Sequence, residues 1–180
     1  SRRLLTLIED IIRLSRLDEG VRGEVTPVDL TALIHHCVQK LTPAAQNAQV
    51  SISASGNDPV LISGDHALLE EMLTNLLENG IKYNHAGGYV RARAEMADGR
   101  AVVTVADNGV GIAPEDQQRV FERFYRVDKS RSKQTGGTGL GLSIVKHGAQ
   151  VHHAQIAMQS ALGEGTTITL TFPAQSSGKK

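Results

Sequence analysis

Glu71-Met-Leu-Thr-Asn75-Leu-Leu-Glu-Asn79-Gly-Ile-Lys82-Tyr83 is the stretch of sequence that decides the fold. At about 100° per residue, its two Asn side chains, Lys82 and Tyr83 fall within one arc of a helix, and leucines fill a separate sector. The leucines predict packing on a core. An Asn oxygen can ligate Mg²⁺ and a Lys can offset phosphate charge, so the polar arc predicts a phosphate site. Taken alone, the stretch fits a solvated amphipathic helix better, and that interpretation stays open.

The N-terminal side of this stretch predicts helices and short strands. Residues 1–19 are apolar over more than one helical stripe, which predicts packing in a bundle or against another chain. A linker over 20–27 follows. The next expected elements are a helix that Asp29 caps and that runs to about Asn47, strands over 50–54 and 60–62, and a helix that Asp65 caps.

The C-terminal side predicts hairpins separated by helices. The expected elements are paired strands over 89–96 and 101–106, a short helix at Pro114, a mobile loop over 129–137, a helix over 140–152, and a hairpin over 155–160 and 166–172. Because helices and hairpins come in separate blocks, the chain predicts an α+β two-layer sandwich, with a mixed, mainly antiparallel sheet packed on helices.

Two glycine motifs follow predicted strands or precede predicted helices. In Asp107-Asn-Gly109-Val-Gly111, glycines allow close backbone approach, and the carboxylate can accept a hydrogen bond from an exocyclic amine such as that of adenine. An ordinary turn explains this motif better when it is taken alone. Residues 135–142 read Thr-Gly-Gly-Thr-Gly-Leu-Gly-Leu before a helix, which favours phosphate. Their spacing matches neither a Walker A loop nor a dinucleotide fingerprint.

Composition excludes several classes of protein. The 180 residues carry 19 basic and 19 acidic side chains, which argues against a nucleic-acid or polybasic membrane-surface protein. The single cysteine, Cys37, excludes an internal disulfide framework. No apolar run has the length of a membrane span.

The order of the motifs resembles a known family. Residues 75–83, 107–111, 121–126 and 137–141 look like the N, G1, F and G2 boxes of bacterial sensor histidine kinases, whose catalytic domain has the Bergerat (GHKL) ATP-binding fold. Residues 121–129 and 134–147 look most like the phosphate-regulon sensor kinase. The resemblance divides the chain into part of a dimerisation and phosphotransfer domain over 1–22, a catalytic domain over 23–174 and a disordered tail over 175–180.

The resemblance implies a site for ATP and Mg²⁺, with Asn79 as the metal ligand. It implies a direct part in the reaction for Asn75, Lys82 and Arg126. The implied nucleotide-binding residues are Asn79, Tyr83, Asp107, Gly109, Gly111, Gly137, Thr138, Gly139, Leu140, Gly141 and Thr166. In this assignment Asp107 bonds the adenine amine, and Thr166 helps it through water.

The reaction type follows from one position in the helix. Gyrase and its relatives place a Glu four residues before the metal-binding Asn, where it acts as a base. Here that position is Asn75, whose amide takes no proton at neutral pH. Glu71 lies too far along the helix and Glu78 points about 100° away. We therefore expect negligible hydrolysis and transfer of the γ-phosphate to an imidazole, which is reactive when neutral.

None of the chain's histidines lies in the sequence box expected of a phosphoacceptor. They are His35, His36, His66, His85, His147, His152 and His153. We expect that the chain begins after the acceptor helix and does not phosphorylate itself. The expected partners are that acceptor domain, a response regulator and a second copy in the full-length protein, with no nucleic acid.

Three further expectations concern setting and alternatives. The chain should be the cytoplasmic domain of a parent anchored in the membrane by a missing N-terminal part. Lys129, Arg131 and Lys133 are expected to keep the mobile loop soluble rather than to bind phosphate. The alternative function is a non-catalytic nucleotide-binding or dimerisation module acting on a response regulator.

Overall fold

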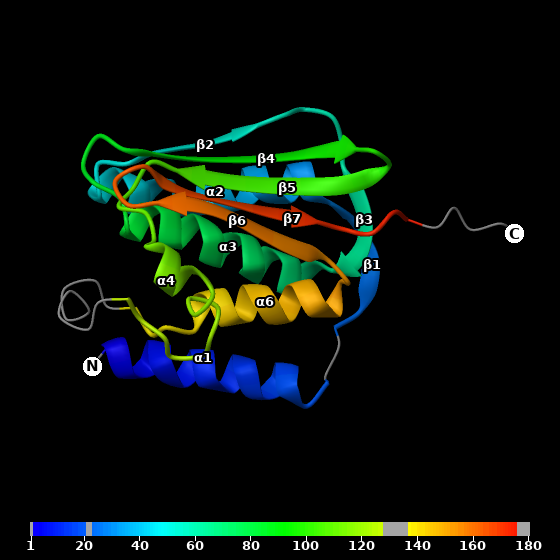
Figure 1. Cartoon of the computed structure of the whole chain (residues 1–180). Helices are drawn as coiled ribbons and strands as arrows, with labels where there is room; N and C mark the ends of the chain where they lie inside the picture. Colours follow the sequence, from blue (N-terminus) through cyan, green and yellow to red (C-terminus); the bar gives the residue numbers. More distant parts are fainter. Residues whose placement is uncertain (1, 21–22, 128–136, 176–180) are drawn as a thin grey trace, which may run out of the picture.

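A computed structural model describes residues 2–20, 23–127 and 137–175. A sheet lies across one side of the molecule, and helices cover one of its faces (Figure 1). The helices are α1 (Arg2–Asp18), α2 (Leu30–Asn47), α3 (His66–Lys82), α4 (Pro114–Gln117) and α6 (Gly141–Val151). None of the helices in the described ranges is long and apolar enough to cross a membrane.

The main sheet is mixed and mostly antiparallel. Its strands run in the order β2 (Ser51–Ser55), β4 (Tyr89–Ala97), β5 (Arg100–Asp107), β7 (Gly165–Thr171) and β6 (Gln155–Ala161). Only β2 and β4 pair in parallel, and α3 lies between them in the sequence. A separate antiparallel pair joins β1 (Val25–Asp29) to β3 (Leu61–Asp65). This arrangement confirms the predicted α+β sandwich.

The structure differs from the sequence prediction at β1. β1 lies partly where a linker was expected. Local sequence does not reveal this strand, because its pairing partner β3 is more than 30 residues away. α2 ends at Asn47 as predicted, with Pro43 inside it. The expected mobile loop and tail lie largely in residues 128–136 and 176–180, outside the described residues.

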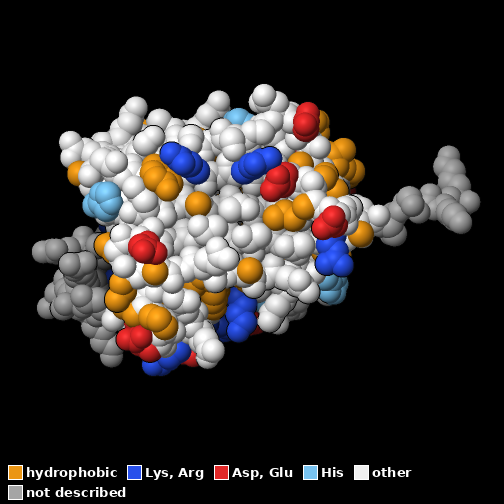
Figure 2. Space-filling model, turned by 45° about the horizontal axis from the view of Figure 1, so that its top comes forward, with side chains coloured by type: hydrophobic (Ala, Val, Ile, Leu, Met, Phe, Trp, Pro, Cys, Tyr) orange, Lys and Arg blue, Asp and Glu red, His pale blue; other side chains and the backbone are white. Residues whose placement is uncertain are grey.

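Aliphatic side chains form the core between the sheet and the helices. On β4, Val90, Ala92 and Ala94 are buried, whereas Arg91 and Arg93 alternate with them on the outer face. On that outer face, a few charged and a few hydrophobic side chains are scattered among other residues (Figure 2). The alternation is what a strand with one buried face requires.

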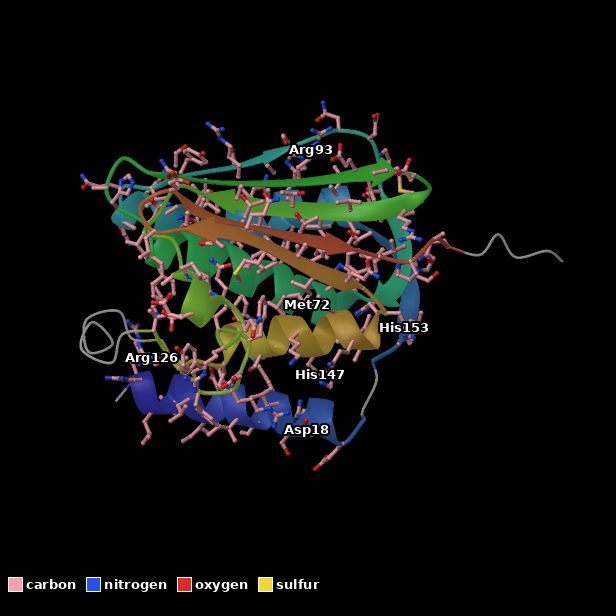
Figure 3. The ribbon with its side chains drawn as sticks, viewed as in Figure 1. Asp18, Met72, Arg93, Arg126, His147 and His153 are labelled. Atoms are coloured by element: carbon pink, nitrogen blue, oxygen red, sulfur yellow. The ribbon has the colours of Figure 1, made fainter. Side chains whose placement is uncertain are left out.

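Helix α3 is held by a cap at its start and by packing along its length. Asp65 caps its first turn, accepting from the Leu68 backbone N–H at 3.1 Å. Its apolar side packs on the sheet and on α6, where Gly148 lies directly against Met72. Figure 3 shows Met72 between α3 and α6. Because α3 is held along its length, its packing also fixes the position of its last residues, which include Lys82.

Helix α1 forms the layer farthest from the sheet and packs on α6 (Figure 1). Leu14 is buried in a small cluster with Leu140 and Ile144. Arg123 makes a two-bond ion pair with Asp18, at 2.9 and 2.6 Å. Five other large apolar side chains of α1 are exposed: Leu4, Leu5, Ile8, Ile11 and Ile12.

Gly80 marks a close approach of α3 to the sheet. A Cβ at this position would lie 2.9 Å from both methyl groups of Val90, which is fully buried. We expect Gly80→Ala to lower the free energy of unfolding by about 1 kcal/mol, because crowding outweighs the better helix propensity of Ala. In a Val90→Ala background the same change should stabilise the protein. Urea unfolding of the four proteins measures this, and a stabilised single variant would contradict it.

Candidate functional site

Asp107 stands at the end of β5, opposite Thr166 on β7. Its Oδ1 accepts a hydrogen bond from the Gly109 backbone N–H at 2.8 Å. Burial raises the pKa of the Asp107 carboxyl, and the backbone N–H groups of Gly109 and Thr166 partly oppose that shift. A half-buried carboxylate held by backbone donors is a fixed acceptor for a ligand's N–H group.

Behind Asp107, polar groups from β6 and β7 support the strand ends. The hydroxyl of Ser160 lies 2.7 Å from that of Thr166 and accepts from the Ile112 backbone N–H at 2.8 Å. Gln117 donates to the carbonyls of Ile112 and Ser160, each at 2.9 Å. Gly111 lies against the Ala161 carbonyl, at a positive φ of 70°. The loop after Asp107 is therefore anchored on its far side.

The end of α3 touches the same loop. The Val110 backbone N–H donates to the Tyr83 carbonyl at 2.9 Å. Gly109 is buried beneath that carbonyl, so close that a Cβ at this position would overlap the carbonyl oxygen. The Tyr83 ring itself remains 44% exposed. The contact brings together the two sequence motifs that were expected to form one site.

Two cations and a glycine backbone meet at the C-terminal end of α3. The Lys82 ammonium group lies where a Cβ of Gly137 would be, and Arg126 Nη2 lies 3.5 Å from that same point. Burial and the positive charge of Arg126 lower the pKa of Lys82 to about 8. Figure 3 shows Arg126 at the opposite end of the molecule from His153. Glycine backbone and converging cations are groups that bind phosphate.

The two asparagines lie on α3, one and two turns before its last residues. Asn75 donates to the Glu71 carbonyl at 2.9 Å, and its Oδ1 lies 2.9 Å from the point where a Cβ of Gly141 would be. Asn79, one turn further on, is half-buried. The described residues contain no cluster of three or more His, Cys, Asp or Glu side chains that could hold a metal. A lone Asn oxygen fits Mg²⁺ that takes its other ligands from phosphates and water.

The glycine loop before α6 is tied down on both sides. The Phe124 backbone N–H donates to the Gly139 carbonyl at 2.9 Å, and Leu140 is fully buried. The Thr138 hydroxyl donates to Asp10 of α1 at 2.7 Å. Tyr125 donates a short hydrogen bond to Asp116 of α4. These anchors lie on both sides of residues 128–136 in the sequence.

Comparison with known proteins identifies the family. Residues 64–176 match the model of the histidine kinase-, DNA gyrase B-, and HSP90-like ATPase family. The chain belongs to this family. The match spans the helix with Asn75 and Asn79, the Asp107 loop and the glycine loop before α6, so it covers the site described above.

Named relatives of the chain are sensor histidine kinases. The chain is 42% identical over 174 residues to the sensor-like histidine kinase SenX3 of Mycolicibacterium smegmatis, covering 96% of this chain and 45% of that protein. It is 38% identical over 178 residues to the phosphate regulon sensor protein PhoR of Pseudomonas aeruginosa, covering 96% and 40%. The chain thus spans less than half the length of these relatives. The expected kinship with the phosphate-regulon sensor is confirmed as homology.

Solved structures give the same result for the fold. Full-length ShkA in complex with AMPPNP superposes with a TM-score of 0.84 at 29% identity, over 97% of this chain and 37% of that one. The mycobacterial sensor histidine kinase MprB superposes with a TM-score of 0.70, also at 29% identity, over 84% and 99%. The histidine-kinase fold expected from the motifs is therefore confirmed.

The structure also shows site residues that sequence reasoning missed. Asn84, His85 and Asn108 join the end of α3 to the Asp107 loop, and Ser160 and Gln117 support that loop from behind. Asp10 reaches the glycine loop from α1. Of these, only Asn108 carried a signal, because it lies inside the Asp-Asn-Gly motif.

Proposed function

We propose that the chain binds Mg-ATP and transfers the γ-phosphate to a histidine of a phosphoacceptor domain. A response regulator would then receive the phosphate on an aspartate. The observation that carries the proposal is the meeting of Lys82, Arg126 and the Gly137 backbone next to the end of α3 that contacts the Asp107 loop. Cations near a carboxylate that accepts hydrogen bonds suit a nucleoside triphosphate, with its phosphates at the cations and an amino purine at Asp107.

The chain's own residues divide the work between binding and charge. Asp107 accepts from the adenine amine, Asn79 holds the metal, and Lys82 and Arg126 offset the charge of the transferred group. Asn79 would hold Mg²⁺, which would supply positive charge against the phosphates. Asn75 stands where hydrolytic relatives have a Glu, and an amide does not deprotonate water. The acceptor that suits this site is a neutral imidazole, whose nitrogen attacks phosphorus as the bond to the ADP oxygen breaks.

Phosphotransfer with and without an acceptor domain tests the proposal. With γ-labelled ATP and Mg²⁺, the chain alone should stay unlabelled, and an added acceptor domain should become labelled on histidine. Asn79→Ala should abolish labelling, whereas Asn57→Ala, at an exposed position outside the site, should leave it intact. Labelling of His35 in the chain, or steady hydrolysis without an acceptor, would contradict the proposal.

Lys82 makes nucleotide binding depend on pH. Because its folded-state pKa is about 8, the free protein loses this charge as pH rises through 8, and affinity for an ATP analogue should fall from pH 7.5 to 9.5. The unfolded chain holds the proton up to 10.5, so the stability of the free protein should rise with pH across that window. Calorimetry at several pH values should show both the fall in affinity and the rise in stability in the wild type, and neither in Lys82→Met. A pH-independent affinity in the wild type would be inconsistent with the assignment.

Helix α1 supports the remaining part of the proposal, which is dimerisation in the full-length protein. Leu4, Leu5, Ile8, Ile11 and Ile12 are exposed on α1, beyond the cluster around Leu14. An apolar helix face of this extent fits a bundle partner. We propose that the partner is the dimerisation domain of the full-length protein.

A further inference from the structure

The turn between α3 and β4 packs against the loop that holds Asp107. Asn84 fixes this turn, since its Oδ1 accepts from the His85 backbone N–H at 2.9 Å and its Nδ2 donates to the Tyr89 carbonyl at 2.9 Å. The His85 side chain is exposed, so its contacts are not imposed by core packing. This turn has no place in the phosphate or adenine contacts proposed above.

The imidazole of His85 bonds to the backbone of the Asp107 loop. Its Nε2 lies 3.0 Å from the Asn108 carbonyl oxygen, and its Nδ1 lies 3.2 Å from the Ala86 carbonyl oxygen. Both nitrogens therefore face carbonyl oxygens, which only accept hydrogen bonds, and a neutral imidazole carries a single N–H. We assign this proton to Nε2, which makes the shorter of the two contacts and so donates to the Asn108 oxygen.

That carbonyl belongs to the same peptide group as the N–H that holds Asp107. The Asn108 C=O and the Gly109 N–H lie in one planar peptide unit and point in opposite directions. On one side His85 donates to the oxygen, and on the other the N–H donates to Asp107 Oδ1 at 2.8 Å. Turning this plane would aim the N–H away from the carboxylate. Two hydrogen bonds in series through one amide also polarise each other.

The side chain of Asn108 holds the same segment from the opposite side. Its Oδ1 accepts from the Tyr89 backbone N–H at 2.6 Å, and its own backbone N–H donates to the Tyr89 carbonyl at 3.4 Å. The peptide between residues 108 and 109 is thus flanked by bonds to β4 and to His85. Its orientation, and with it the direction of the Asp107 carboxylate, depends on these two side chains.

We propose that His85 and Asn108 are positioning residues that determine selectivity for a 6-amino purine. They act through the peptide between Asn108 and Gly109, which sets the direction in which Asp107 presents its carboxylate oxygens. The inference rests on the proposed function, in which Asp107 accepts from the adenine amine. It assigns the recognition of that amine to residues outside the nucleotide contacts themselves.

Paired affinities for ADP and IDP test the inference, because these nucleotides differ at the 6-position of the purine and neither undergoes transfer. We expect the wild type to favour ADP, and His85→Ala to weaken ADP binding about fivefold, the worth of one hydrogen bond, while changing IDP binding less than about twofold. His85→Gln, whose amide nitrogen can reach the Asn108 oxygen, should restore selectivity. His66→Ala, an exposed histidine at the other end of α3, is the matched control.

The outcomes separate the two proposals. If the wild type favours ADP and His85→Ala keeps the full preference, or loses both affinities equally, the positioning role is wrong and the proposed site stands. If the wild type binds neither nucleotide or does not distinguish them, the adenine assignment of Asp107 is wrong, and the inference falls with it. The Gly109 amide proton gives a nucleotide-free readout: its NMR shift should move upfield in His85→Ala and not in His66→Ala. An unchanged Gly109 resonance in His85→Ala would contradict the proposed action of His85 through the peptide between Asn108 and Gly109.

Discussion

Asp107→Asn is expected to weaken binding of an ATP analogue by between about 10-fold and 100-fold. The loss is that of a hydrogen bond to a charged acceptor, since the amide turns one of the two acceptor oxygens into a donor. The amide would also face the backbone N–H groups of Gly109 and Thr166, which donate to the carboxylate in the wild type. Calorimetric titration with the analogue and Mg²⁺ measures the effect, and Asp58→Asn, on an exposed loop, is the control.

The pH dependence of this residue has a defined sign. Burial raises the pKa of Asp107 above its ordinary 3.8, so analogue affinity should fall as pH decreases through the raised value. Between pH 3.8 and the raised pKa, the folded state binds more protons than the unfolded state. The free energy of unfolding of the free protein should therefore fall as pH rises through this range, and Asp107→Asn should remove this slope. An affinity that Asp107→Asn leaves unchanged would refute the assignment of Asp107 to the nucleotide.

Gly109→Ala is expected to reduce analogue affinity more than about 100-fold and to lower the free energy of unfolding by about 2 kcal/mol. A Cβ at Gly109 would overlap the Tyr83 carbonyl oxygen, which cannot swing away as a side chain could. The Asp107 loop and the end of α3 must then separate, which breaks the bond between Val110 and Tyr83 and displaces Asp107. Calorimetry and urea unfolding measure the two effects.

A glycine with open space around it supplies the control for this prediction. Gly99 has a φ of 76°, and no atom lies within 4 Å of the point that a Cβ would occupy, so Gly99→Ala costs only left-handed backbone strain. It should destabilise the protein by about 1 kcal/mol and leave analogue affinity intact. Equal loss of affinity in both variants would show that Gly109 acts through general stability and not through the fit of the two loops.

Local chemistry was enough to predict most elements. Asp29 and Asp65 cap helices where the sequence places them, because a cap needs only a side-chain oxygen next to the first turn. The Asp98-Gly99 turn joins β4 and β5 as expected, since both residues adopt positive φ. β1 was missed because its alternation is short, and because β3, with which it pairs, lies beyond the whole of α2.

The candidate site, like the fold, was partly predictable from the sequence and partly decided by tertiary packing. The order of the Asn, Asp and glycine motifs by itself determined the family, the fold and the residues that should face a nucleotide, because residue type and spacing are written along the chain. Only the tertiary structure decided that Lys82 meets Gly137, that Asp10 holds Thr138, and that His85 reaches the peptide behind Asp107. Each of these contacts joins segments brought together by the packing of α1, α3 and α6 and by the pairing of β4 with β5. No local pattern encodes such distances, because they depend on how the whole core closes.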